Sequence, residues 1–501
     1  MPQDRWVLHV CRGPERHTWL DPDDAAKCCN GYVRAHRITR DANGDAVLVY
    51  YWAPASTVVT PEPTGRRTSV RWTINRLSHA AWFERLAEVA DTAPEWQVIK
   101  AGLLTLRLVD KYVADALRGI RLTHKEFVAV RRDVEALPAS PMRRILRRIV
   151  QTAATYESGA LPPLSPVLMA MGDLLERRGE HSLAADVYGT MAEYANSRRD
   201  QEAAPYAYVR MGACLRQLGR LDDAATAYRL GRSIADRLGA FEATLHLDLG
   251  LAAIELERSD YAAAEVALDA LIAQAAGAGR GPGPNPVLAA AYHDRGVVAI
   301  HRGDPATALR WLGDALAEAR TDLVHRQRIA TDVAKGLSHI GLGDAARTIC
   351  STLAEHATQP ELRWMAAITH LELAGADGNA NEFDAVRTRL DGEGLSARCR
   401  AFYALRLADG HRRLGRPASA VEAYRLAIQY GADAKLDHIA DTAQARLDDA
   451  DHTPWRAAQH APPVADDVVA TVLASVGQLR RDLAVIGPEP NGPRRPGLTT
   501  G

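Results

Sequence analysis

The sequence predicts a mostly α-helical fold, a right-handed α-solenoid of helix-turn-helix repeats preceded by a small N-terminal α/β module. Three observations lead to this prediction. A pattern of five residues recurs through the middle of the chain, and apolar residues around it return every three or four positions. Aromatic residues make up only 6% of the 501 residues, while alanine is abundant. This composition favours helices that pack closely against one another.

The first 55 residues are predicted to form the α/β module. Segments 4–11 and 46–52 are rich in β-branched and aromatic residues and are expected to be strands. A helix is expected over 21–37, because Asp21 can cap it and Pro22 suits its first position. Residues 56–70 contain Pro61 and Pro63 and are interpreted as a linker.

Thiols and imidazoles gather in this module. They could bind zinc, but no C-x2-C pair is present, and adjacent cysteines on a helix diverge by about 100°. The sequence leaves two interpretations open, a metal site or ordinary thiols, and we expect no metal or cofactor. The residues concerned, between positions 9 and 36, are His9, Cys11, His17, Cys28, Cys29 and His36.

Residues 71–160 are predicted to be helical, with helices over 76–90, 94–118, 123–136 and 141–158 between proline and glycine breaks. Arginines within 121–148 form a stripe at helical spacing. The stripe could contact phosphates or an acidic partner, or it could be a solvated face paired with nearby acids. Its members are Arg131, Arg132, Arg143, Arg144, Arg147 and Arg148.

The repeat begins with Gly172, Leu175, Gly179, Ala184 and Tyr188. The same five offsets return as Gly212, Leu215, Gly219, Ala224 and Tyr228; as Gly250, Ala253, Glu257, Ala262 and Val266; as Gly296, Ala299, Gly303, Ala308 and Leu312; as Ala334, Leu337, Gly341, Ala346 and Cys350; and as Ala408, His411, Gly415, Ala420 and Tyr424. The gap between Ala334 and Ala408 leaves room for one further, degenerate copy.

Each copy is expected to be a pair of antiparallel helices. A small residue at the first position and alanine at the fourth let two helix backbones approach, and the larger fifth residue fills the space beside them. The glycine at the third position ends the first helix. One such pair cannot bury its own apolar face, so neighbouring pairs must stack.

These residues resemble the tetratricopeptide repeat (TPR) family over roughly residues 162–445. The resemblance implies a curved helical array that holds an extended or helical peptide in its concave groove. Groove-facing candidates are Met169, Asp173, Arg177, Val209, Arg216, Leu247, Leu251, His293, Val297, Lys335, Asp409 and Arg412. Family members that bind chaperone tails hold a terminal carboxylate with Lys, Asn and Arg in fixed positions, and no Asn occupies the corresponding position here. A terminal helix is predicted within 464–501, followed by a disordered tail.

Several function classes receive no support. The net charge of −1 does not favour nucleic acid as a partner, and no P-loop, dinucleotide fingerprint or nucleophile elbow is present. The longest apolar stretch, residues 468–476, is far shorter than the roughly 20 residues of a membrane span. With six cysteines and no visible secretory signal, we expect reduced thiols and a cytoplasmic location.

The sequence therefore predicts a non-enzymatic scaffold or adaptor that binds a protein or peptide partner, without catalytic residues. An alternative from another class is a ligand-responsive, transcription-linked regulator whose basic region 121–148 contacts nucleic acid or a transcription component. The identity of the partner and the oligomeric state stay open.

Overall fold

The computed structural model describes residues 8–11, 18–19, 32–40, 46–51, 72–73, 79–90, 92–118, 124–154, 163–197, 200–277, 284–434, 436–449 and 464–486. The chain forms two compact units, residues 1–214 and residues 215–501. The boundary falls inside helix α8 (Ala203–Gln217) and not at the predicted start of the repeats. The predicted linker 56–70 and the tail after residue 486 lie outside the described residues.

The first unit begins with an antiparallel sheet of order β2-β1-β3-β4-β5. Its strands are β1 (Leu8–Cys11), β2 (Thr18–Trp19), β3 (Tyr32–Arg40), β4 (Ala46–Tyr51) and β5 (Trp72–Thr73). The prediction of a helix over 21–37 is wrong at residues 32–37, because these residues belong to strand β3. Residues 32–36 alternate between polar and apolar, which suits a strand, and β3 pairs with both β1 and β4. The α/β module is thus not supported, because every described element before residue 79 is a strand.

The helices of the first unit are α2 (Ala80–Glu88), α3 (Pro94–Arg118), α4 (His124–Glu135), α5 (Pro141–Ala154), α6 (Ser165–Glu176) and α7 (His181–Ser197). Helices α2 and α3 pack on α7, and α5 packs on α6, so this region continues directly onto the first repeat. The side chain of Trp82 is buried at this junction, and its Nε1 donates to the carbonyl oxygen of Leu183 at 3.2 Å.

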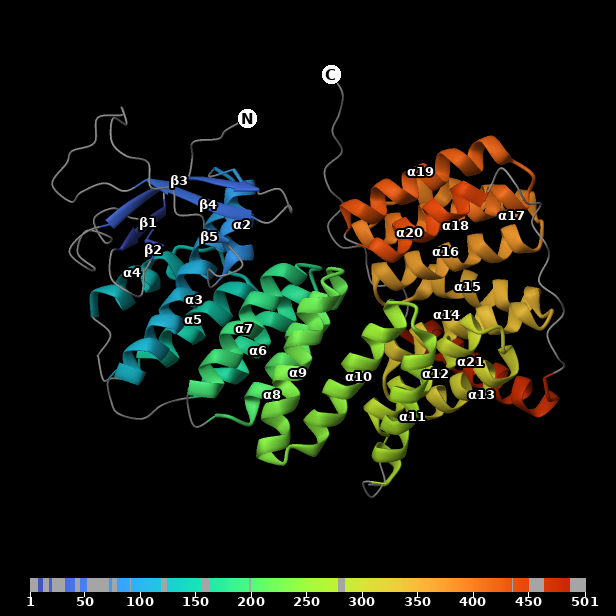
Figure 1. The fold of residues 1–501 in the computed structure, drawn as a ribbon, viewed down its shortest axis with the longest axis horizontal. Coiled ribbons are helices and arrows are strands. Elements are labelled where there is room, and N and C mark those ends of the chain that lie inside the picture. The colour runs from blue at the N-terminus through green and yellow to red at the C-terminus, as the bar shows by residue number, and fades with distance from the viewer. Residues whose placement is uncertain are drawn as a thin grey trace. The chain divides into compact units, whose positions relative to one another are not determined.

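The second unit contains the remaining repeats (Figure 1). After α8 come α9 (Leu221–Leu238), α10 (Phe241–Glu257), α11 (Tyr261–Gly277), α12 (Pro286–His301), α13 (Pro305–Glu318), α14 (Leu323–His339), α15 (Gly343–His356), α16 (Pro360–Ala376), α17 (Ala380–Asp391), α18 (Ala397–Arg413), α19 (Pro417–Asp433), α20 (Asp437–Asp449) and α21 (Asp466–Ile486). The predicted TPR-like array of helix pairs is confirmed.

The turns within the pairs fix the register of the repeat. Each contains one residue with positive φ, and these residues are Gly179, Gly219, Ser259, Gly303, Gly341, Gly378 and Gly415. Counting back seven residues gives a buried first position in every copy, namely Gly172, Gly212, Ala252, Gly296, Ala334, Leu371 and Ala408. The array therefore has seven such copies among the described residues.

The predicted register of the third copy is wrong by two residues. The sequence pointed to Ala262 and Val266, but Ala262 is exposed and Val266 is 71% exposed. Ala264 and Leu268 are buried in their place. The reason lies in the turn, where Ser259 adopts the left-handed conformation that glycine takes in the other copies.

The predicted degenerate copy is the pair α16–α17, in which Phe383 stands at the alanine position. Its ring needs room that alanine does not need, and two glycines supply it. A Cβ atom on Gly410 would overlap the Phe383 ring, and one on Gly375 would lie 2.9 Å from the Gly410 Cα and 3.4 Å from the ring. The larger residue at one position is therefore matched by missing side chains opposite it.

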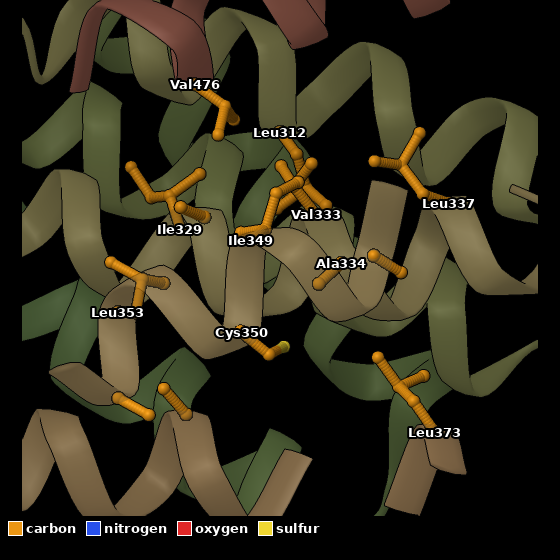
Figure 2. Packing of buried hydrophobic residues seen from close by; sticks show 14 of the residues in the cluster. Leu312, Ile329, Val333, Ala334, Leu337, Ile349, Cys350, Leu353, Leu373 and Val476 are labelled. Carbon is orange, nitrogen blue, oxygen red and sulfur yellow. The ribbon is translucent and has the colours of Figure 1, made fainter. Parts of the chain in front are cut away.

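Helix α21 does not extend the array at its end but packs against α13, α14 and α15. Figure 2 shows Val476 of α21 above Leu312, Ile329 and Ile349, and all four residues belong to one buried hydrophobic cluster. The ion pair between Arg326 Nη1 and Asp482 Oδ2, 2.6 Å long, adds a polar contact between α14 and α21.

Candidate functional site

The first helices of successive pairs form the inner layer of the second unit. Helices α10, α12, α14, α16, α18 and α20 each contact the next one in this series. No comparable contact joins successive second helices in the part of the chain that the structure describes. The more closely spaced layer lies on the inside of a curved array, so the exposed side of these first helices is concave. We call it the inner face.

A polar cluster links α12 to α14 on the inner face. His293 Nδ1 lies 3.2 Å from His325 Nε2, and His293 Nε2 lies 2.9 Å from Asp332 Oδ2. Lys335 Nζ donates to the other oxygen of Asp332 at 2.8 Å. Asp332 is therefore held by two helices at once.

A second cluster links α16, α18 and α20. Arg406 Nη1 lies 3.1 Å from Glu372 Oε1 and 3.6 Å from Asp409 Oδ2. Asp409 also accepts from Tyr424 Oη at 2.8 Å and pairs with Arg446. Opposite charges thus alternate across three successive first helices.

The two clusters influence each other electrostatically. Burial works to raise the pKa of Asp332, but Lys335 and the hydrogen bond from His293 outweigh it and hold that pKa well below its usual range. Burial also works to raise the pKa of Glu372, and Arg406 and Lys335 outweigh it in the same way. Both carboxyl groups are therefore ionised at neutral pH, although both are partly buried.

Three histidines on this face, His301, His325 and His339, have lowered pKa values and are neutral at neutral pH. Burial, together with the charges of Lys335 and Arg406, lowers the pKa of His301. Burial lowers the pKa of His339, and it lowers the pKa of His325 to about 4 with a further contribution from His293. The ring of His301 also stacks on Tyr261, with 4.9 Å between ring centroids. Neutral imidazoles next to fixed charges can both donate and accept hydrogen bonds.

Solvent still reaches these charges. The side chain of Lys335 is 29% exposed and that of Arg406 is 23% exposed. They are surrounded by protein on several sides but are not sealed within it. This is the environment in which a ligand can form hydrogen bonds and ion pairs that are stronger than those on a convex surface.

One polar contact recurs in both units and joins neighbouring repeats. In the first unit, Asp173 accepts from Tyr188 Oη at 2.8 Å and from Arg210 Nη2 at 2.7 Å. Asp409, Tyr424 and Arg446 repeat this arrangement in the second unit, with the same 37-residue separation of Asp and Arg. The aspartate follows the first position of the repeat, and the tyrosine is the fifth position.

The predicted groove residues therefore divide into several groups. His293 and Lys335 are brought together through Asp332, and Asp409 joins the second cluster. Leu247 and Asp409 are buried, whereas Arg177 is exposed. Arg216 pairs with Glu257 at 2.6 Å. The half-buried candidates without a described role in either cluster are Met169, Val209, Leu251, Val297 and Arg412.

Sequence reasoning missed Asp332, His325, Glu372 and Arg406. One signal could have revealed Glu372. It follows Leu371, the first position of the degenerate copy, just as Lys335 follows Ala334 and Asp409 follows Ala408. Asp332 lies three residues before Lys335, a spacing that places both on one side of a helix.

The other sequence candidates are placed as follows. Arg143 and Arg147 both contact Glu135, while the remaining four arginines of the basic stripe are exposed. The side chains of the Cys and His residues between positions 9 and 36 lie outside the described residues. No cluster suited to a metal ion occurs among the side chains that the structure does describe. None of the described helices has the length and apolar character of a membrane span.

No family model matches the chain, and no curated protein matches it. Among solved structures, the chain is similar to a Rap protein complexed with competence and sporulation factor, at 12% identity and a TM-score of 0.35, with 78% of this chain and 99% of that chain covered. It is also similar to the TPR domain of P58(IPK), at 14% identity and a TM-score of 0.20, with 71% and 99% covered. At these TM-scores neither likeness assigns a residue, a ligand or a partner to this chain.

Proposed function

We propose that this chain is a non-enzymatic scaffold or adaptor that binds a protein or peptide on the inner face of its TPR-like repeats. One observation carries the proposal. The inner face of the second unit concentrates charged and histidine side chains from α12, α14, α16 and α18 that remain within reach of solvent. A face with a purely structural role would be expected to bury apolar residues there instead.

The physical argument concerns specificity. Charges in a concave, partly desolvated surface interact strongly with a complementary ligand and reject one with the wrong charges. The pairs are already formed in the free protein, so little ordering is needed when a ligand binds. A peptide offers many polar groups in a row and fits a face that spans several helices.

The experiment is selection of a displayed random peptide library on the full chain, followed by affinity measurements on the enriched peptides. The inner-face variant is Asp332→Asn/Lys335→Met, which removes both partners of one pair and so leaves no isolated charge. The matched control is Arg310→Gln/Arg425→Gln, at exposed positions on the second helices α13 and α19.

The enriched peptides should bind the inner-face variant at least about tenfold more weakly, and the control with unchanged affinity. Equal affinity for all three proteins would exclude the inner face as the binding site. Circular dichroism of each variant verifies that the helices are intact.

The regulator alternative receives no specific support from the contacts of the basic stripe, in which Glu135 engages two of the six arginines and the other four are exposed. A cytoplasmic location stays a prediction.

A further inference from the structure

Polar residues on α14 form one stripe along the inner face. His325, Arg328, Asp332, Lys335 and His339 follow one another at spacings of three or four residues, so all five share one side of the helix. Asp332 and Lys335 belong to the first cluster described above, which places the whole stripe on the inner face.

Helix α18 carries a matching stripe. Arg398, Phe402, Arg406, Asp409 and Arg413 share one side of this helix at the same spacings. Arg406 and Asp409 belong to the second cluster. Arg328 and Arg398 therefore stand near the N-terminal ends of two stripes that flank α16.

These two arginines differ from the other cations on the face. Arg216, Lys335, Arg406 and Arg446 each contact a carboxylate, as the ion pairs above show. Arg328 and Arg398 have no ion pair with any carboxylate among the described residues, although Glu361 and Asp322 lie nearby. The guanidinium of Arg398 instead lies over the ring of Phe402, at 5.3 Å from its centroid.

A buried donor is left without an acceptor at this place. Nη1 of Arg398 is buried and has no hydrogen-bond partner in the part of the chain that the structure describes. Buried N–H groups are nearly always satisfied in folded proteins, so this atom is available to an acceptor outside the described residues, such as a ligand oxygen. A charged donor makes this requirement stronger.

The surrounding field also favours an anion. The Arg328 side chain reaches solvent, but the protein around it removes part of its hydration and so lowers its pKa. Glu361 opposes this effect, and the like charges of Arg216 and Arg398 lower the pKa further. Arg398 lies in the first turn of α18, where the helix dipole is positive. A negative group between them would relieve the repulsion and accept the orphaned hydrogen bond.

We infer that Arg328 and Arg398 form an anion subsite on the inner face, which takes a carboxylate side chain of an acidic peptide ligand. The inference rests on the proposed function and names the chemistry of its ligand. A carboxylate matches the planar fork of a guanidinium, so it can accept from the buried Nη1 of Arg398 and is also attracted by the charge of Arg328. Neither arginine occupies the position that follows the first residue of a repeat, where Lys335 and Asp409 lie.

The test uses peptides enriched on the full chain and versions in which each Asp or Glu is replaced by Asn or Gln. Each peptide is titrated by fluorescence anisotropy against the native chain, against Arg328→Gln/Arg398→Gln, and against the control Arg310→Gln/Arg425→Gln. We expect one acidic residue of the peptide to contribute most to the affinity. The peptide with Asn or Gln at that position should bind the native chain and the control about ten- to a hundredfold more weakly than the original peptide. The subsite variant should bind both versions of that peptide with the same low affinity.

Three outcomes would overturn the inference. The enriched peptides could lack acidic residues. The replacement of Asp or Glu by its amide could reduce the affinity for the subsite variant as much as it reduces the affinity for the native chain. Binding could also require phosphoserine in place of Asp or Glu. These results leave the proposed function standing as long as Asp332→Asn/Lys335→Met weakens the same peptides. If no enriched peptide depends on any inner-face residue, the proposed function fails as well.

Discussion

The helix crossings and the inner face belong to the same repeats. The residue at the crossing is nearly the same in every copy, whereas the residue on the inner face differs from copy to copy. At the crossings, alanine occupies the fourth position in six of the seven copies, and Phe383 occupies it in the remaining copy, α16–α17. On the inner face, the residue after the first position changes from Val297 to Lys335, Glu372 and Asp409. The crossing is fixed because two backbones must approach there, whereas the inner face is constrained only by its own ion pairs and by what binds to it.

The strongest effect is expected at the crossing with Phe383. Phe383→Ala removes a ring that is fully buried between Gly375 and Gly410, and the cavity should cost roughly 3–5 kcal/mol of unfolding free energy. Urea denaturation measures it. Val386→Ala, at a half-buried position on the same helix, serves as the control and should cost clearly less. Similar losses for both variants would contradict the packing of this copy.

The next prediction tests the register of the third copy. Ala264→Leu should overpack the crossing of α10 and α11 and cost roughly 1–3 kcal/mol, because Ala264 is fully buried. Ala262→Leu makes the same chemical change two residues earlier at an exposed position and should stay within about 0.5 kcal/mol of the native protein. Melting temperatures of the two variants compare them directly, and a reversed order would favour the register with Val266 at the fifth position.

The inner face should be visible in the pH dependence of stability. His325 has a folded pKa of about 4, below its ordinary value near 6.5, so the unfolded chain binds more protons between these values. Stability should therefore fall as the pH drops from about 6.5 to 4, by at most about 1.4 kcal/mol per pH unit from this group. In His325→Gln the fall should be shallower. A profile as steep as that of the native chain would show that His325 titrates normally.

The smallest effect on stability is expected for Arg328. This side chain is exposed and has no described ion pair, so Arg328→Gln should change the unfolding free energy by less than about 0.5 kcal/mol. Urea denaturation of Arg328→Gln, with Arg310→Gln as the control, measures the change in unfolding free energy. A loss comparable to that of Ala264→Leu would mean that Arg328 supports the fold itself, and the contrast between crossings and inner face would fail at this position.

Much of the fold could be predicted from the sequence because its signals are local. Spacing of three and four residues, alanine at the crossings and glycine at the turns all lie within one helix pair. The predicted register of the third copy was wrong because Ser259, and not a glycine, adopts the left-handed conformation in that turn. The prediction was also wrong over residues 32–37, because the alternation that marks β3 was outweighed by an apparent helix cap at Asp21.

The site could be predicted only in part. His293 and Lys335 were expected on the inner face, but Asp332 between them was not. Ion pairs such as that of Arg406 with Glu372 join residues more than 30 positions apart, and they depend on the relative rotation of two helices. The spacing of residues within a single helix does not indicate how that helix is rotated relative to its neighbour.

Site-specific photo-crosslinking on the full chain can show whether a ligand binds on the inner face. A photoreactive amino acid replaces Val297, which lies on the first helix α12, or Val266, which lies exposed on the second helix α11. An enriched peptide should be cross-linked at position 297 and not at position 266. Cross-linking at position 266 alone would contradict binding on the inner face and would place the ligand on the outer side of the repeats.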